Sequence, residues 1–388
     1  MQTLRFKRLV ADVHAWTGAL VCLLLLLVTL SGIASAFLGD LFRLQYPDLY
    51  GGLEFNDDAG GASVDLLVAN AATAFDGQFI PLGANLPGGH FDIEKAFVYG
   101  GVPDGKGGGE LAAVVLNPYT GEILGTHPIL SSWAYLVVHF HENLLLGQGG
   151  AWTVAVSGVL MLLFVITGLY QWFPRSGRTL QKVTHFRLRG NGRSKMFQLH
   201  GLLGFWFAFP VILFAVTGVY IAKPNWLANA LPEIQAKTTP EIAERLSQCE
   251  SGSVSLSDAV SVVTQELPGR RIIGLTMPMP FPQLPPEDAA AYSFATSTPK
   301  DIHKHEGDAR IWVSATCPGL FYIERVDRSN LRDSVGAMVY SLHSGRSLGP
   351  FRLLFVVGSG LVLTALLCAG FYVWWTGNLR KFRKRWNR

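Results

Sequence analysis

Four long apolar segments, each with a histidine at one end, constrain the fold of this 388-residue chain more than any other feature. They span approximately residues 16–38, 152–173, 201–222 and 351–375. Each is long enough to cross a hydrocarbon layer about 30 Å thick at about 1.5 Å per helical residue. Arg352, at the rim of the last segment, is the one charged side chain within them. The sequence therefore predicts a membrane protein with an all-α four-helix transmembrane bundle.

Two of the histidines are followed by glycines at identical spacings. His14 and His200 each have a glycine at position +4 and another at +18, and eighteen residues make five helical turns, so the second glycine returns to the histidine's face. These glycines are Gly18, Gly32, Gly204 and Gly218.

The other two histidines, His141 and His343, share a longer pattern. Each is followed at matching distances by a Leu-Gly pair, two more glycines, a tyrosine and a tryptophan. The matching residues are Leu146 and Leu348, Gly147 and Gly349, Gly158 and Gly360, Gly168 and Gly370, Tyr170 and Tyr372, and Trp172 and Trp374. Because so many residues in register are not expected by chance, we infer an internal duplication.

The distribution of positive charge predicts the orientation in the membrane. Segment 174–199 contains seven Lys and Arg residues and no acid, and the tail 376–388 contains six and no acid. Lys and Arg are retained on the cytoplasmic side, so we expect both chain ends and this loop to lie in the cytoplasm, and the protein to lie in a bacterial inner membrane. The net charge of +4 is then explained by orientation and by anionic membrane lipid, and does not indicate nucleic acid.

The chain is therefore expected to consist of eight parts. In order they are the cytoplasmic N-terminus with the first span (1–38), a first periplasmic domain (39–151), the second span (152–173), a basic cytoplasmic loop (174–199), the third span (200–222), a second periplasmic domain (223–350), the fourth span (351–375) and a basic cytoplasmic tail (376–388). The N-terminal segment also resembles a secretory signal peptide. Its apolar stretch is longer than a signal peptide needs, so we expect a retained anchor.

Each periplasmic segment has a helical pattern followed by strand patterns. The first predicts a helix over 63–75 and strands over 91–99, 111–116 and 122–124. The second predicts a helix over 255–266 and strands over 271–277, 291–296, 310–315 and 320–326. We therefore expect two α+β domains.

The cysteines divide between the spans and the second periplasmic domain. Cys22 and Cys368 lie in spans and are expected to be inert. Cys249 and Cys317 lie in the second periplasmic domain, where an oxidising compartment permits a disulfide, although sequence does not fix their separation.

The four histidines are candidate ligands of haem iron. A histidine at the edge of a bilayer is costly without a partner. The predicted orientation puts His14 beside His200 and His141 beside His343, so each pair can bind one b-type haem through two imidazoles. Iron with two histidine ligands has no open position, so its chemistry is electron transfer. The alternative for any one of them is a helix-packing hydrogen bond.

Several other residues are candidates around these ligands. Gly18 and Gly204, with Gly32 and Gly218, would let the flat ring approach the backbone. Arg346 and Arg352 are candidate partners of the haem propionates, or simply interfacial side chains. His139 lies beside His141, but its repeat equivalent is Ser341, so the duplication favours His141. His303 and His305 form either a metal site or part of a solvated loop.

The histidine-led spans, the sequences FHENLLLG (140–147) and LHSGRSLG (342–349), and the turn NPYTGE (117–122) resemble the PepSY-associated transmembrane family. The second periplasmic domain has DRSN (327–330) in place of that turn. Within the family, the chain resembles inner-membrane ferric-siderophore reductases of the ferrioxamine type. The resemblance implies PepSY-like periplasmic domains and an oxidoreductase with two haems at His14, His141, His200 and His343.

The resemblance also implies the reaction and the partners. Electrons would pass outward to a ferric siderophore in the periplasm, where Fe(III) becomes Fe(II) and is released for iron transport. No flavin, nucleotide or iron–sulfur motif occurs, so quinol or a cytoplasmic reductase is the expected donor. Two alternatives remain: a non-enzymatic PepSY module that binds a periplasmic partner, and a quinol-linked cytochrome that feeds a periplasmic enzyme.

Overall fold

The computed structural model describes residues 2–52, 60–89, 93–103, 109–173, 190–226, 249, 252–280, 290–301, 307–326 and 338–386. They belong to two compact units. The helical unit comprises Met1–Ala36, Val137–Ala230 and Val339–Arg388, and the sheet unit comprises Phe37–Leu136 and Leu231–Met338.

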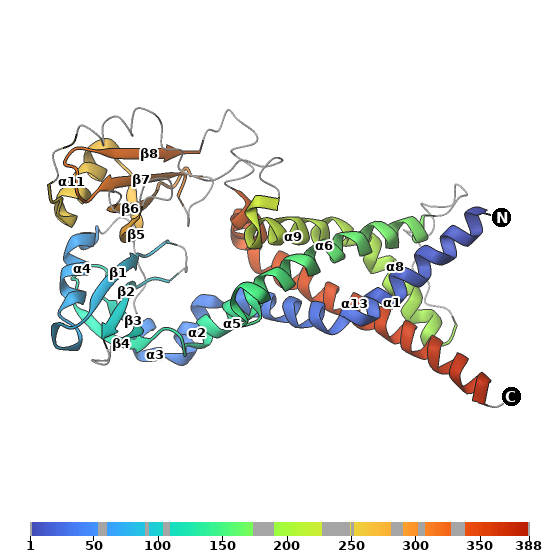
Figure 1. Ribbon diagram of the computed structural model, residues 1–388. Coiled ribbons are helices and arrows are strands. Elements are labelled where there is room, and N and C mark those ends of the chain that lie inside the picture. The colour runs from blue at the N-terminus through green and yellow to red at the C-terminus, as the bar shows by residue number, and fades with distance from the viewer. Residues whose placement is uncertain are drawn as a thin grey trace. The chain divides into compact units, whose positions relative to one another are not determined.

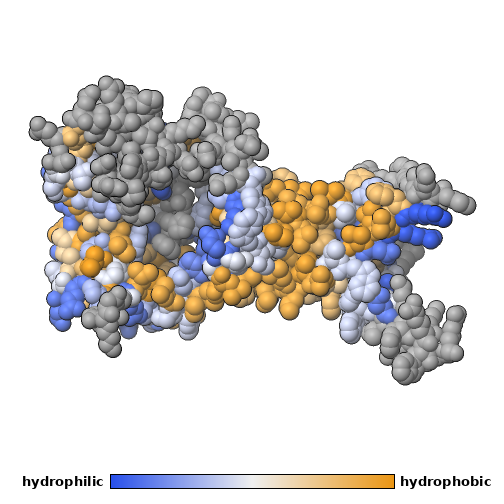
Figure 2. Space-filling view, viewed as in Figure 1, coloured by the Kyte–Doolittle hydropathy of each residue, from blue (hydrophilic) through white to orange (hydrophobic). Residues whose placement is uncertain are grey.

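The helical unit contains three helices that are long and apolar enough to cross a membrane, or four when a bent pair is taken as one span. The three are α1 (Gln2–Ser35), α6 (Gly147–Trp172) and α13 (Arg352–Trp386) (Figure 1). Apolar side chains form a band over these helices (Figure 2). Among them Leu20 is 83% exposed and Leu354 is 74% exposed, as expected where lipid replaces water.

The third apolar segment, for which the sequence predicts one span, is bent in the structure. It forms α8 (Gly192–Trp206) and α9 (Ala208–Ala222), which meet at an angle of 64° around Phe207. Pro210 explains the bend, because its ring collides with the carbonyl four residues earlier, at Trp206, and it lacks an N–H to donate.

These helices pack around one another in pairs. The contacts join α1 to α13 and to α6, α6 to α9, and α13 to α8. A shorter helix, α5 (Trp133–Asn143), precedes α6. A 3₁₀ turn, η3 (Pro224–Trp226), follows α9, and another, η4 (Arg346–Phe351), precedes α13.

The sheet unit contains a single eight-stranded antiparallel sheet. Its strand order is β4-β3-β2-β1-β5-β6-β7-β8 (Figure 1). The strands are β1 (Ile80–Asn85), β2 (Ala96–Pro103), β3 (Gly109–Leu116), β4 (Ile123–Pro128), β5 (Arg271–Pro280), β6 (Ala290–Ser297), β7 (Ala309–Ser314) and β8 (Phe321–Arg325).

The strands of the two periplasmic segments therefore join, although the sequence predicts two separate α+β domains. The joint is the antiparallel pair β1–β5, in which Ala84 lies opposite Leu275. Strand β1 has no predicted counterpart because Pro81 and Gly83 are unfavourable in strands. Gly83 is nevertheless required, since a side chain there would overlap the Tyr99 hydroxyl and the Leu275 carbonyl.

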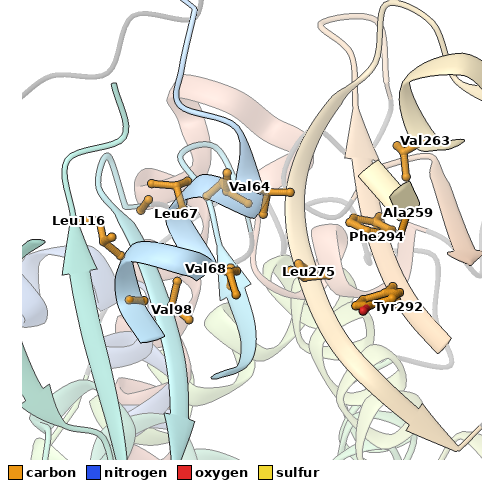
Figure 3. Close-up of a cluster of buried hydrophobic side chains, with 14 of the residues drawn as sticks. Val64, Leu67, Val68, Val98, Leu116, Ala259, Val263, Leu275, Tyr292 and Phe294 are labelled. Atoms are coloured by element: carbon orange, nitrogen blue, oxygen red, sulfur yellow. The ribbon is translucent and has the colours of Figure 1, made fainter. Parts of the chain in front are cut away.

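One hydrophobic core lies between this sheet and two helices. Helices α4 (Val64–Ala72) and α11 (Leu256–Glu266) precede the first strand of each group of four. Their apolar side chains pack on the same sheet face, where Leu67 is 1% and Phe294 0% exposed (Figure 3). A capping box at Ser255 and Asp258 begins α11, because each side chain bonds the other's backbone N–H. The two segments thus share one core as well as one sheet.

His127, to which the sequence assigns no role, links strand β4 to two short helices, α2 (Leu38–Gln45) and α3 (Pro47–Tyr50). Its Nε2 accepts a 2.7 Å hydrogen bond from the Tyr50 hydroxyl, and its Nδ1 donates to the Pro128 carbonyl at 2.9 Å. Burial lowers the pKa of His127 more than the Pro128 carbonyl raises it, so the ring is neutral. This histidine is therefore a structural residue of the sheet unit.

A disulfide joins Cys249 to Cys317, the pair that the sequence permits, with their Cα atoms 5.9 Å apart. Cys317 follows β7, so the bond attaches residue 249 to the second group of strands. Cys22 and Cys368 are free thiols.

We expect replacement of both Cys249 and Cys317 by serine to lower the free energy of unfolding of the sheet unit by about 4 kcal/mol, because the bond closes a loop with a sequence separation of 68 residues. Chemical unfolding of the full chain, followed by circular dichroism, measures the loss. Replacing Cys22 and Cys368 instead is the matched control and should leave it unchanged. Alkylation of all four cysteines without a reductant would contradict the disulfide.

Candidate functional site: two histidine pairs among the helices

The structure brings the four candidate histidines together as two pairs. His14 lies in α1 and His200 in α8, and their ring centroids are 6.3 Å apart with the planes at 81°. His141 lies near the end of α5 and His343 in the helical segment 338–343, and their centroids are 6.0 Å apart with the planes at 39°. These are the two pairings that the predicted orientation gives.

Each ring lies against a glycine of a neighbouring helix. A Cβ added to Gly32 would lie 2.7 Å from Cε1 of His141, and one at Gly218 would lie 3.1 Å from Cε1 of His343. At Gly370 and Gly168 the corresponding distances to His200 and His14 are 3.0 Å and 3.5 Å. We call Gly32, Gly168, Gly218 and Gly370 the cradle glycines. Their missing side chains leave the space that the imidazole rings fill.

The cradle glycines act on different histidines from those that the sequence suggests. Gly32 follows His14 in α1, and the sequence suggests that it lies beside the haem of the His14–His200 pair. In the structure Gly32 instead contacts His141, which belongs to the other pair. Likewise, Gly218 follows His200 yet contacts His343. Helix α1 thus contributes to both pairs, because it carries His14 of one pair and Gly32, which contacts His141 of the other pair.

The Nδ1 atom of every ring has a hydrogen-bond acceptor. His141 donates to the Val28 carbonyl and His200 to the Leu366 carbonyl, both at 2.9 Å. His14 and His343 bond to the hydroxyl oxygens of Thr167 and Thr217, both at 2.8 Å.

We assign both threonine hydroxyls as acceptors, because each also lies within hydrogen-bond distance of a carbonyl of its own helix, and a carbonyl can only accept. Thr167 donates to the Leu163 carbonyl at 2.7 Å, and Thr217 donates to the Leu213 carbonyl at 2.6 Å. All four rings therefore carry their proton on Nδ1, which leaves the Nε2 lone pair. Among the described residues, none of these four Nε2 atoms makes a hydrogen bond.

The histidine contacts group the helices into two sets, which we call the first and the second half. In the first half, α1 and α5–α6, His14 contacts α6 and His141 contacts α1. In the second, α8–α9 and 338–386, His200 contacts α13 and His343 contacts α9. Each histidine is thus positioned by its own half, whereas each pair combines one histidine from each half.

The remaining candidates have different surroundings. No described atom lies within 4 Å of a Cβ added at Gly18, and at Gly204 the nearest atom, Cδ2 of Leu366, is 3.7 Å away. Arg352 donates to the backbone carbonyls of Ala36 at 2.9 Å and Ser344 at 3.4 Å, so it joins α13 to the end of α1. The Arg346 guanidinium lies 5.6 Å from the Tyr340 ring centroid.

Of the other histidines that the structure describes, neither His127 nor His139 joins these pairs. His139 lies two residues before His141 on α5 and therefore on a different face of that helix. Its Nδ1 is 3.6 Å from the Glu142 carboxylate and 3.4 Å from the Asn143 amide nitrogen. His303 and His305 lie outside the described residues. Within the described part of the chain, no group of three or more His, Cys, Asp or Glu residues could bind a metal ion.

Two imidazoles are too few to bind a bare structural ion such as zinc, which takes four protein ligands. Two opposed imidazoles with nitrogen–metal bonds of roughly 2.0 Å have ring centroids roughly 6 Å apart. The observed separations of 6.3 Å and 6.0 Å match that spacing. Each pair thus suits a metal whose remaining ligands come from a cofactor.

The sequence did not point to the residues that position the rings, although a signal for them was present. The residue before each cradle glycine is small: Ser31, Thr167, Thr217 and Ala369. Three of these four carry a hydroxyl, and two of them accept from a histidine. A hydroxyl directly before a repeated glycine was therefore the available signal.

These features define a class: proteins with apolar helices that carry paired histidines, joined to an antiparallel α+β unit. The chain matches the model of the PepSY-associated TM region over residues 11–376, nearly its whole length. It therefore belongs to this family and is a membrane protein. A search of individual curated proteins found no match.

We expect Gly32→Ala to destabilise the helical unit by about 1–3 kcal/mol, because the new methyl group would overlap the His141 ring. Gly168→Ala is the matched control. Its methyl group meets His14 at ordinary contact distance, so the substitution should be neutral or stabilise the helix by up to about 1 kcal/mol. Unfolding in detergent, followed by circular dichroism, measures both. Equal effects of the two substitutions would contradict the ring placement.

Proposed function

We propose that this protein is a di-haem b-type cytochrome of the bacterial inner membrane that reduces ferric siderophores in the periplasm. The observation that carries the proposal is the similar ring separation in the two histidine pairs, together with four Nε2 atoms that make no hydrogen bond among the described residues. Neutral imidazole with Nδ1–H bonded to a carbonyl or hydroxyl is the usual state of a metal-binding histidine.

The residues around the pairs fit a porphyrin. Gly18 has open space where a side chain would project, and Gly204 has only a distant leucine methyl, which suits a flat ring near the backbone. Ser344 Oγ, beside His343, and Trp374 Nε1, one turn after Gly370, are buried without a hydrogen-bond partner among the described residues. Both can donate to an acidic group, as a haem propionate is.

The haem would supply reversible one-electron transfer, and two histidines would hold each haem. The protein's own residues position the ligands and exclude water. His14 and His200 would bind one haem, and His141 and His343 the other. Because each pair takes one histidine from each half, we propose that the helices form a duplicated four-helix bundle with the cofactors between the halves.

The proposed orientation places both chain ends and segment 174–199 in the cytoplasm, and the sheet unit in the periplasm. The Cys249–Cys317 disulfide supports that side for the sheet unit, because such bonds persist in oxidising compartments. Quinol or a cytoplasmic reductase would then supply electrons.

The substrate class follows from the resemblance to siderophore reductases and from coordination chemistry. Hard oxygen ligands bind Fe(III) tightly and Fe(II) weakly. One electron transferred to the chelated Fe(III) yields Fe(II), which the siderophore releases. Two rival functions are a non-enzymatic module that binds a periplasmic partner, and a quinol-linked cytochrome that feeds a periplasmic enzyme.

Purified protein should contain two haems per chain, measured by visible absorption and haem extraction. His14→Ala and His141→Ala should each remove one haem, because each breaks a different pair. His139→Ala is the matched control and should retain both, since its ring lies outside the pairs. Protein without a Soret band from haem-replete cells would rule out the cytochrome and favour the non-enzymatic module.

Chemically reduced protein, mixed anaerobically with a ferric hydroxamate siderophore, should reoxidise while an Fe(II) chelator captures the released iron. The expected ratio is one Fe(II) per electron lost. His141→Ala should abolish the reaction if this pair lies on the periplasmic side. Failure of ferric hydroxamates and ferric catecholates alike to oxidise the wild-type haems would exclude the reductase function and leave the quinol-linked cytochrome.

A further inference from the structure

The Nδ1 partners of the four histidines are not all of one kind. Each pair contains one histidine whose acceptor is a threonine hydroxyl and one whose acceptor is a backbone carbonyl. His14 has Thr167 and its partner His200 has the Leu366 carbonyl. In the other pair, His343 has Thr217 and His141 has the Val28 carbonyl.

This pattern depends on the residue directly before each cradle glycine, because that position carries a threonine in only one of the two halves at each pair of equivalent positions. Thr167 of the first half corresponds to Ala369 of the second, so His200 can bond only to the backbone. Thr217 corresponds to Ser31, whose hydroxyl is 3.5 Å from His141 Nδ1, while the Val28 carbonyl is at 2.9 Å. The outcome is a single threonine-bonded histidine in each pair.

We propose that Thr167 and Thr217 are positioning residues that set the reduction potentials of the two haems separately, because each hydroxyl lies 2.8 Å from the Nδ1 atom of one histidine of its pair. The proposal rests on the di-haem function. An acceptor on Nδ1–H makes the imidazole a stronger electron donor through Nε2, and a stronger donor stabilises Fe(III) over Fe(II). Removal of the hydroxyl weakens that donation, so the potential of the affected haem rises.

The test is a redox titration of the full-length haem protein, followed by visible absorption and by electron paramagnetic resonance (EPR). The ring planes cross at 81° in one pair and at 39° in the other, so the two oxidised haems should give distinct resonance signals. Thr167→Val, which keeps the side-chain shape and removes the hydroxyl, should raise the potential of one haem and change its signal. Thr217→Val should raise the potential of the other haem and change the other signal.

Two further variants separate this role from a purely structural one. Thr167→Ser restores the hydroxyl and should return the potential and the signal to those of the wild type. Thr29→Val is the matched control, because Thr29 also donates to its own helix, at 2.7 Å to the Leu25 carbonyl, but its side chain is not hydrogen-bonded to any described histidine. It should leave both haems unchanged. Selective loss of one haem in Thr167→Val, restored in Thr167→Ser, also supports the proposal.

Failure of the threonine proposal and failure of the cytochrome proposal give different results. Wild-type protein without haem would overturn the cytochrome itself. Wild-type protein with two haems, combined with unchanged potentials and signals in Thr167→Val and Thr217→Val, would overturn the role of the threonines alone. If Thr29→Val shifted a haem potential as much as Thr167→Val does, the effect would be due to general destabilisation. That result would also overturn the role of the threonines.

Discussion

The contact of an imidazole ring with the bare backbone of a neighbouring helix is the interaction on which the helical unit depends. It occurs four times, at Gly32, Gly168, Gly218 and Gly370. At each place the glycine admits the ring, and an acceptor within the preceding turn binds Nδ1–H. A buried polar ring in an apolar environment is costly unless it is hydrogen-bonded. The combination of glycine and acceptor therefore fixes both the position of each histidine and its tautomer.

The same repeated glycines also explain how the halves pack together. A Cβ at Gly158 would lie 2.6 Å from Cγ2 of Val219, and one at Gly360 would lie 2.5 Å from Cγ1 of Ile33. Ile33 and Val219 directly follow cradle glycines, so neighbouring positions on one helix serve different contacts. The cradle glycine contacts a histidine of its own half, and the branched residue after it packs against a glycine of the other half. Close helix packing through small residues is typical of membrane proteins.

The sequence predicted the apolar helices and the histidine pairs that the structure brings together, because these depend on composition and on regular spacing, and the resemblance of its motifs identified the family. It did not predict the bend at Phe207, where Pro210 disrupts an otherwise apolar segment. It also did not predict β1, because Gly83 is unfavourable in a strand. The joining of the two expected domains into one sheet was therefore not predicted either, since it depends on the non-local pairing of β1 with β5. The glycines were recognised as a repeat, but which histidine each one contacts depends on how the helices pack.

In the proposed function, the protonation of the ligands determines what can cross the membrane. Each Nδ1–H is engaged with a carbonyl or hydroxyl, and each Nε2 would be engaged with iron, so the rings have no lone pair left to carry a proton. The helices would then conduct electrons without accompanying protons. Outward movement of an electron from a negatively charged cytoplasm is favoured by about 2.3 kcal/mol per 100 mV of membrane potential. In the proposed orientation, the membrane potential therefore adds to the driving force for reducing a tightly chelated Fe(III) outside the cell.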